Sequence, residues 1–362
     1  MALSYYKETL RETARKLATP GKGILAVDES TNTCGKRLAS IGVENTEENR
    51  QAYRGMLFTT KGLGNYISGA ILFEETLFQD HADGESMVAK LEKQGIVPGI
   101  KVDKGLKPLV GGLEHETYCS GLDGLTERAS DYYARGARFA KWRAVLQITN
   151  GSWDNHIPSG PSDLAIKENA WGLARYARAV QEAGLVPIIE PEILMDGDHD
   201  ILTTSEIQEK IIKEVYSACQ QNGVYLEGTL LKPSMTVPGA DYEGKSDPKN
   251  VALATVTTLL RSVPAAVPGI VFLSGGLSEE EASLYLNEMN LLAADKPWNL
   301  SFSYGRALQH SALRAWGGSN ETEGQKFVLA RAQANSEASK GLYVLGSQPS
   351  SDEKLFVAGY TY

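Results

Sequence analysis

The sequence predicts an α/β fold of the (β/α)8 barrel (TIM-barrel) class, formed by a single domain with a flexible C-terminal tail. Eight short segments are rich in β-branched or small apolar residues and end in polar or charged ones. Helical patterns long enough for a crossover separate most of them, as expected for a parallel sheet covered by helices. No G-x-G-x-x-G follows the first segment, GILAVDES, so the alternative of a doubly wound sheet is disfavoured.

The predicted elements alternate along nearly the whole chain, after an amphipathic helix expected over residues 1–16. The strand segments are residues 23–29, 66–75, 96–105, 137–148, 185–194, 224–235, 269–276 and 299–308. The clearest helical patterns are residues 46–58, 124–135, 162–183 and 205–222. We expect residues 1–340 to form the barrel. Residues 341–362 are rich in Gly, Ser and Pro without helical periodicity, and we expect them to form a mobile tail.

Composition excludes several classes of protein. The 362 residues are 42% hydrophobic, enough for a large core without disulfides or a structural metal. The net charge of −9 argues against general nucleic-acid binding, and no run of about eighteen apolar residues predicts a membrane span. Three isolated cysteines without C-x-x-C spacing indicate a reducing compartment. We therefore expect a cytoplasmic location, with the plastid stroma as the alternative if a leader has been removed.

Charged residues lie at the ends of several predicted strands, often two positions apart. Side chains at i and i+2 of a strand point the same way, and barrel active sites lie at the carboxyl ends of strands. These groups should therefore meet in one lumen, where buried charges are unfavourable unless paired. The alternative is that the glutamates only neutralise basic neighbours in a structural ion network. The set comprises Asp28, Lys101, Asp103, Lys141, Arg143, Glu190, Glu192 and Lys232.

Lys232 is the predicted nucleophile. It follows a run of apolar residues in EGTLLKPSM, and both desolvation and the nearby Lys141 disfavour its charged form. A neutral amine can attack a ketone and form an iminium, which accepts the electrons of a breaking C–C bond. Glu190 is the predicted acid for loss of water, kept partly protonated by Glu192. Asp28, supported by Lys141, is the predicted base for a substrate hydroxyl.

Two cationic sites for anionic groups are predicted. The seventh strand segment ends in Ser274 and Gly275, and the eighth ends in Gly305 and Arg306. Barrel enzymes often bind phosphate through backbone N–H groups after strands seven and eight, and arginine binds two phosphate oxygens. A second site is expected after the first strand, although its basic pair is equally consistent with an ordinary exposed surface. Its residues are Ser30, Thr33, Lys36 and Arg37.

A metal-dependent mechanism is disfavoured, and no cofactor is expected. The five histidines are scattered, with no pair at i, i+2, i+3 or i+4. A catalytic zinc needs about three closely placed ligands.

The motifs together resemble those of class I fructose-bisphosphate aldolases. They include GILAVDES, PGIKVDKG, ARFAKWR, GLVPIIEPEIL, LEGTLLKPSM, VFLSGG and FSYGRALQ, in fixed order from about residue 5 to about residue 339. The resemblance implies a metal-independent (β/α)8 barrel that assembles as a homotetramer. It also implies reversible cleavage of fructose 1,6-bisphosphate to glycerone phosphate and glyceraldehyde 3-phosphate. The ending FVAGYTY is most similar to plastid-type or algal members.

The resemblance also implies roles for individual residues. It assigns the Schiff base to Lys232, acid–base chemistry to the glutamates of EPE and the aspartate of DES, and proton transfer by a mobile tail to Tyr362. It assigns substrate contacts to the remaining motif positions. The matching positions are Asp28, Lys101, Lys141, Arg143, Glu190, Glu192, Lys232, Ser274, Arg306 and Tyr362.

Departures and competing hypotheses remain. Leu277 stands where the family often has a glutamine, and the tail that includes GLYVLGS differs from the usual pattern. A transaldolase-like enzyme acting on sugar monophosphates is the alternative enzyme, but two cationic sites favour a bisphosphate. A secondary scaffold role, with partners binding at the same basic cleft, is the alternative from a different class.

Overall fold

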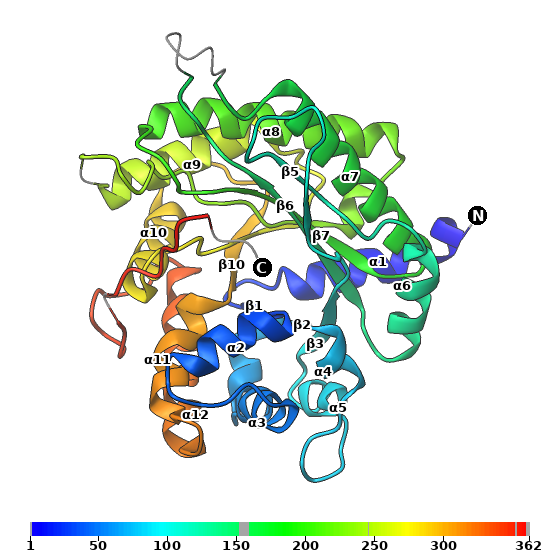
Figure 1. The fold of residues 1–362 in the computed structure, drawn as a ribbon, viewed down its shortest axis with the longest axis vertical. Coiled ribbons are helices and arrows are strands. Elements are labelled where there is room, and N and C mark those ends of the chain that lie inside the picture. Colours follow the sequence, from blue (N-terminus) through cyan, green and yellow to red (C-terminus); the bar gives the residue numbers. More distant parts are fainter. Residues whose placement is uncertain (1, 152–158, 245, 352, 360–362) are drawn as a thin grey trace.

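The computed structural model describes residues 2–151, 159–244, 246–351 and 353–359, and its centre is a closed barrel of eight parallel strands (Figure 1). All eight predicted strand segments contribute to it, so the predicted fold class is confirmed. The strands are β1 (Gly23–Val27), β2 (Ile67–Leu72), β3 (Val97–Lys101), β6 (Phe139–Leu146), β7 (Val186–Ile193), β8 (Leu230–Leu231), β9 (Gly269–Phe272) and β10 (Asn299–Tyr304). Around the barrel they follow the order β1-β10-β9-β8-β7-β6-β3-β2.

Helices surround the barrel and include the crossovers that join its parallel strands (Figure 1). The longer ones are α1 (Ala2–Leu17), α2 (Thr31–Ala39), α3 (Glu47–Phe58), α6 (Leu125–Ala134), α7 (Asp163–Glu182), α8 (Ile201–Gln221), α9 (Pro248–Ser262), α10 (Glu279–Leu291), α11 (Arg306–Trp316) and α12 (Glu321–Ala338). Shorter pieces are α4 (Glu74–Phe78), α5 (Met87–Glu92), η1 (Leu63–Asn65) and η2 (Leu226–Gly228).

Side-chain caps set where the helices begin. Thr46 and Ser162 accept the N–H of the residue three positions on, at the starts of α3 and α7, as expected for N-caps. The helix predicted from residue 205 begins at Ile201, because the Asp200 carboxylate accepts the N–H of Thr203 at 2.8 Å. An unrecognised aspartate cap is therefore the reason for that error.

The amino-terminal half of the barrel lumen is apolar. Phe139 of β6 lies at its centre, and a Cβ added at Gly99 of β3 would lie 2.3 Å from the Phe139 ring. Glycine at that position therefore makes room for the aromatic ring. Helix α1 closes this end with Leu10, Ala14 and Leu17, which pack in the same cluster as Phe139. A larger apolar cluster lies between the strands and the outer helices.

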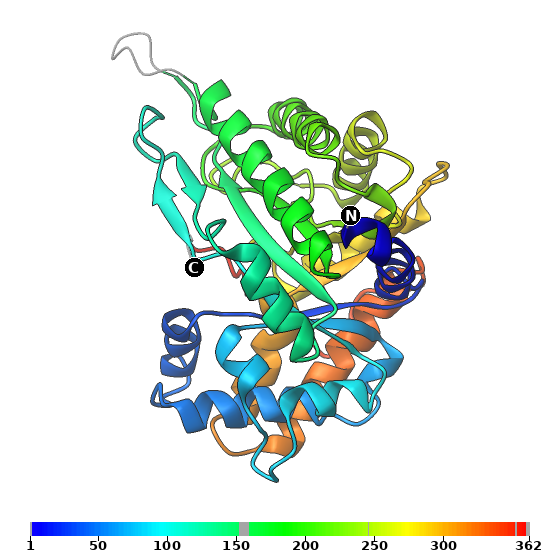
Figure 2. The same cartoon turned by 90° about the vertical axis from the view of Figure 1, so that its right-hand side faces the viewer.

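The opposite end of the barrel carries an additional hairpin and the chain's last segment. β4 (Leu106–Pro108) and β5 (Thr117–Cys119) pair antiparallel after β3. In Figure 2 this hairpin, in cyan, and helix α1, in blue, lie on opposite sides of the molecule. The described part of the tail packs against the barrel, since Tyr343 and Leu355 are buried.

Candidate active site

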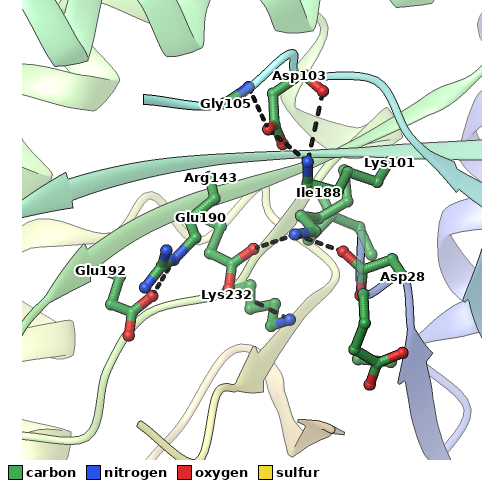
Figure 3. A network of polar contacts seen from close by, with 12 residues as sticks. Asp28, Lys101, Asp103, Gly105, Arg143, Ile188, Glu190, Glu192 and Lys232 are labelled. Atoms are coloured by element: carbon green, nitrogen blue, oxygen red, sulfur yellow. Dashed lines mark hydrogen bonds and ion pairs between the residues drawn. The ribbon is translucent and has the colours of Figure 1, made fainter. Parts of the chain in front are cut away.

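Two lysines and two carboxylates form a buried network, contributed by β6, by β7 and by the residues that directly follow β1 and β8 (Figure 3). The Lys141 ammonium nitrogen lies 2.7 Å from Asp28 Oδ2 and 3.3 Å from Glu190 Oε2. The other oxygen of Glu190 lies 3.2 Å from the Lys232 Nζ. Glu190 therefore bridges both lysines, a position from which it can exchange a proton with either.

Two further ion pairs flank this network. Glu192 accepts a hydrogen bond from Arg143 Nε, and Lys101 Nζ lies 2.8 Å from Asp103 Oδ1. The parallel register brings these charges close together. Arg143 is the strand partner of Glu190, which lies two residues before Glu192 on the same strand, and Lys101 is the strand partner of Lys141. Glu192 thus pairs with a cation, instead of repelling Glu190 as the sequence suggested.

Pairing makes the burial of these charges tolerable. Lys141 is fully buried, and Glu190 and Lys232 are 1% and 2% exposed. Burial alone favours a neutral carboxyl, but the positive charges of Lys141, Lys232 and Lys101 hold the pKa of Asp28 below its ordinary value. Likewise, burial is outweighed by Arg143, which holds the pKa of Glu192 below its ordinary value. Both carboxyls are therefore ionised at neutral pH.

A small cavity of about 50 Å³ opens above the network. It brings together most of the predicted catalytic and anion-binding residues from strands on both sides of the lumen. Among the predicted residues, its lining includes Asp28, Arg37, Glu190, Glu192, Lys232, Ser274, Gly275, Gly305 and Arg306. Lys141 and Arg143 are buried beside it and contact carboxylates that line it. Lys101 is also buried, but neither it nor its partner Asp103 is part of the cavity lining.

The predicted phosphate loop follows β9. Gly275 and Gly276 have φ angles of +56° and +109°, in the region that favours glycine, and the turn leads to α10, which Ser278 caps. Arg306 opens α11 beside this loop. Its guanidinium donates to the carbonyl of Leu355, whose own N–H donates to Gly276 at 3.0 Å. The tail thus covers the loop. The Leu277 side chain is part of the apolar cluster between the strands and the outer helices, where a polar side chain would not pack.

Other predicted residues are not part of the cavity lining or lie outside the described residues. Lys36 is exposed and does not line the cavity, although the neighbouring Arg37 does. The Ser30 hydroxyl accepts the N–H of Thr33 at 3.3 Å and so caps α2. Tyr362 lies outside the described residues.

The sequence reasoning missed two polar residues of the cavity lining. Glu29 follows Asp28 directly, lines the cavity and accepts hydrogen bonds from Arg37 and Gln309. Ser303 lines the same cavity, and its buried hydroxyl has no hydrogen-bond partner among the described residues. The available signal for Ser303 was its place two residues before Gly305 on a strand whose end was already predicted to bind an anion.

A family model for class-I fructose-bisphosphate aldolase matches residues 9–362. The chain is 57% identical to chloroplastic fructose-bisphosphate aldolase 3 of Arabidopsis thaliana, covering 99% of this chain and 89% of that one. It is 54% identical to chloroplastic aldolase 1 of Pisum sativum, with 99% and 98% covered. A solved aldolase from Plasmodium falciparum, in complex with TRAP and a small-molecule inhibitor, superposes with a TM-score of 0.90 at 53% identity, covering 94% and 96%.

The chain belongs to the class I fructose-bisphosphate aldolase family. The resemblance inferred from the motifs is therefore confirmed, as are the aldolase reaction on fructose 1,6-bisphosphate and the assignment of the chain as a lyase. The lysine Schiff base is the route characteristic of class I aldolases. A sugar bisphosphate as the aldolase's substrate follows from the same family.

The expected cytoplasmic location is wrong. Chloroplastic aldolases of several plants match at 54–57% identity. A cytosolic aldolase of Arabidopsis thaliana matches at 55%, so the error arose because the barrel and its site carry little information about compartment.

No group of three His, Cys, Asp or Glu side chains in the described ranges is placed to hold a metal ion. Within the same part of the chain, no helix is long and apolar enough to cross a membrane.

Proposed function

We propose that Lys232 is the amine through which this aldolase forms its Schiff base, and that Glu190 supplies the proton chemistry. The supporting observation is the 3.2 Å contact between Lys232 Nζ and Glu190 Oε1. Transfer of one proton across it yields a neutral amine and a neutral carboxylic acid, the forms that the next two steps require. The amine then adds to the C2 carbonyl, and the acid protonates the carbinolamine hydroxyl, which leaves as water.

C–C cleavage follows from the other side of the network. Asp28 accepts the proton of the C4 hydroxyl, the C3–C4 bond breaks, and its electrons move into the iminium to give an enamine. Lys141 holds Asp28 ionised and in place at 2.7 Å. Glu192, ionised through Arg143, keeps negative charge beside the iminium.

The two phosphates would occupy opposite sides of the lumen. Ser274, Gly275, Gly305 and Arg306 follow the neighbouring strands β9 and β10 and support one phosphate site. Lys101 lies on β3, four strands away from β9 around the eight-stranded barrel, and Arg143 lies on the adjacent β6. An elongated bisphosphate could therefore be held at both ends. The loop after β1 would complete the binding surface through Ser30, Thr33, Lys36 and Arg37.

The tail is proposed to move during turnover. With Leu355 bound to Arg306, the free cavity of about 50 Å³ is too small for a sugar bisphosphate. We infer that substrate phosphate displaces the Leu355 carbonyl, and that residues 341–362 form a mobile segment on a barrel domain of residues 1–340. Tyr362 would then protonate the enamine carbon. Removing residue 362 should slow this step while leaving C–C cleavage intact, as measured by isotope exchange at glycerone phosphate.

Assembly and location are also proposed. The family favours a homotetramer, which sedimentation at micromolar concentration would test against a monomer. The chloroplastic relatives favour the plastid stroma, which imaging of a fluorescent fusion in cells would test. Secondary binding of scaffold partners would be competed by substrate if it uses the same cleft.

Borohydride trapping tests the central proposal. The protein is reduced in the presence of fructose 1,6-bisphosphate and a chelator, then digested and analysed by peptide mass spectrometry. We expect a stable adduct on Lys232 and activity insensitive to the chelator. An adduct on another lysine, or no adduct, would refute the assignment.

A further inference from the structure

Asp103 is a buried carboxylate that the proposed chemistry leaves without a role. Its side chain is 2% exposed and that of Lys101 is 5% exposed. Lys101 Nζ contacts Asp103 Oδ1 at 2.8 Å and the Asp103 carbonyl at 3.5 Å. In the view of Figure 3 the two side chains meet above Asp28 and Glu190.

The carboxylate of Asp103 is itself held by the loop after β3. Its Oδ1 accepts the N–H of Gly105 at 3.3 Å. The loop is fixed in turn, because Lys104 donates its N–H to Ser120 at 2.8 Å and Ser120 donates to Gly105 at 3.0 Å. These bonds join the loop to the base of the β4–β5 hairpin. Asp103 is therefore a rigid anchor, the arrangement that holds a charged group in one position.

A second carboxylate, Asp28, also attracts the Lys101 ammonium. Lys101 is the register partner of Lys141 on a neighbouring parallel strand, so the two side chains point the same way about 4.8 Å apart at the backbone. Its charge reaches Asp28, since it is among the cations that lower the pKa of that carboxyl. Without its own counter-ion, Lys101 would compete with Lys141 for Asp28.

We propose that Asp103 is a positioning residue that holds the Lys101 ammonium at the β3 side of the lumen, away from Asp28, where it can meet the substrate phosphate opposite Arg306. This inference rests on the proposed binding of that phosphate by Lys101. Two of the ammonium's three donors can be directed by Asp103, which leaves one for the substrate.

A double-mutant cycle tests the proposal. Asp103→Asn keeps the shape but removes the charge, and Lys101→Met removes the cation. We expect Asp103→Asn to raise KM for fructose 1,6-bisphosphate about tenfold and change kcat less than threefold. KM for fructose 1-phosphate, which lacks the second phosphate, should change less than twofold. The double variant should match Lys101→Met within a factor of two, because Asp103 then has nothing to position.

Controls separate a local effect from loss of charge. Glu114→Gln and Lys104→Met make the same kinds of change at exposed positions in the same region, and both should keep wild-type KM. If Asp103→Asn does not fold, Asp103→Glu moves the carboxylate by one methylene, and the same rise in KM for the bisphosphate is expected.

The outcomes are distinct. The positioning role would be overturned if the two substitutions acted independently and multiplied in the double variant. It would also be overturned if Asp103→Asn raised KM equally for both substrates or left KM unchanged. Trapping distinguishes this failure from failure of the proposed function: a Lys232 adduct in the wild type with unchanged KM in Asp103→Asn rejects only the positioning role. If Lys101→Met itself leaves KM for the bisphosphate unchanged, the phosphate contact on which the inference rests is wrong.

Discussion

The amino-terminal half of the barrel lumen is filled by apolar side chains, whereas the carboxyl-terminal half holds paired acids and bases. The same strands build both halves. Phe139 lies two residues before Lys141, Ile188 before Glu190 and Leu230 before Lys232. Two residues advance a strand by about 6.6 Å and return the side chain to the same face. A step of two residues along one strand therefore leads from the apolar core to the reactive site.

The difference teaches how buried charge can be tolerated. The apolar half provides tight packing, including the Phe139 ring over Gly99 and the closing helix α1. The charged half relies on pairing and on carboxylates that each contact a cation. Substitutions in the charged half should therefore affect activity first, and those in the apolar half should affect stability first.

The largest expected effect is at Lys232. Lys232→Met should lower kcat by at least about a thousandfold, because the variant lacks the amine on which the iminium is proposed to form. Stability should change little, because Glu190 keeps its contact with Lys141 at 3.3 Å. Steady-state kinetics and urea unfolding measure the two effects, with Lys104→Met as the exposed control. Residual turnover above a few per cent would contradict the mechanism.

The apolar half should respond in the opposite way. Phe139→Ala should lower the free energy of unfolding by about 3–5 kcal/mol, because it leaves a cavity in a tightly packed core. The kcat of the folded fraction should stay within twofold of wild type. Urea unfolding at fixed protein concentration measures the loss, and Phe139→Leu should lose less. A large fall in kcat with unchanged stability would show that the two halves are not separable.

Much of this division could be predicted from the sequence. Apolar strand segments that carry Lys141, Glu190 and Lys232 predicted a barrel with one reactive end, because strand period and barrel geometry leave few alternatives. The partners could not be predicted, because register decides them. Glu192 was expected to repel Glu190 but pairs with Arg143, a contact across strands that no local pattern encodes.

Other parts lay beyond local patterns for similar reasons. Ser303 and Glu29 enter the cavity only through barrel closure, which brings β10 beside β1. The contact of Leu355 with Arg306 joins residues 49 positions apart in a tail without periodicity. The start of α8 was misplaced because Asp200, in an acidic loop, was not recognised as a cap.

A smaller effect should appear in the acid dependence of stability. Because the pKa of Asp28 is lowered in the folded protein, its ionised form stabilises the fold above the unfolded value of about 3.9, and this contribution is lost as pH falls through the folded pKa. Asp28→Asn should therefore flatten the fall in stability below about pH 4, as measured by urea unfolding at several pH values. Phe139→Leu should keep the wild-type slope, and an equal slope in Asp28→Asn would contradict this account.

The smallest effect is expected where the loop after β9 contacts the tail. Gly276 has a φ of +109°, and a Cβ there would lie 3.0 Å from the Phe356 Cα. Gly276→Ala should lower the free energy of unfolding by about 1–2 kcal/mol and raise KM for fructose 1,6-bisphosphate several-fold, because both the phosphate loop and the tail must shift. Gly42→Ala is the matched control, since its φ is +74° but nothing lies within 4 Å of the added methyl. It should lose stability without a change in KM. Equal KM values in both variants would mean that the tail contact at this loop has no part in substrate binding.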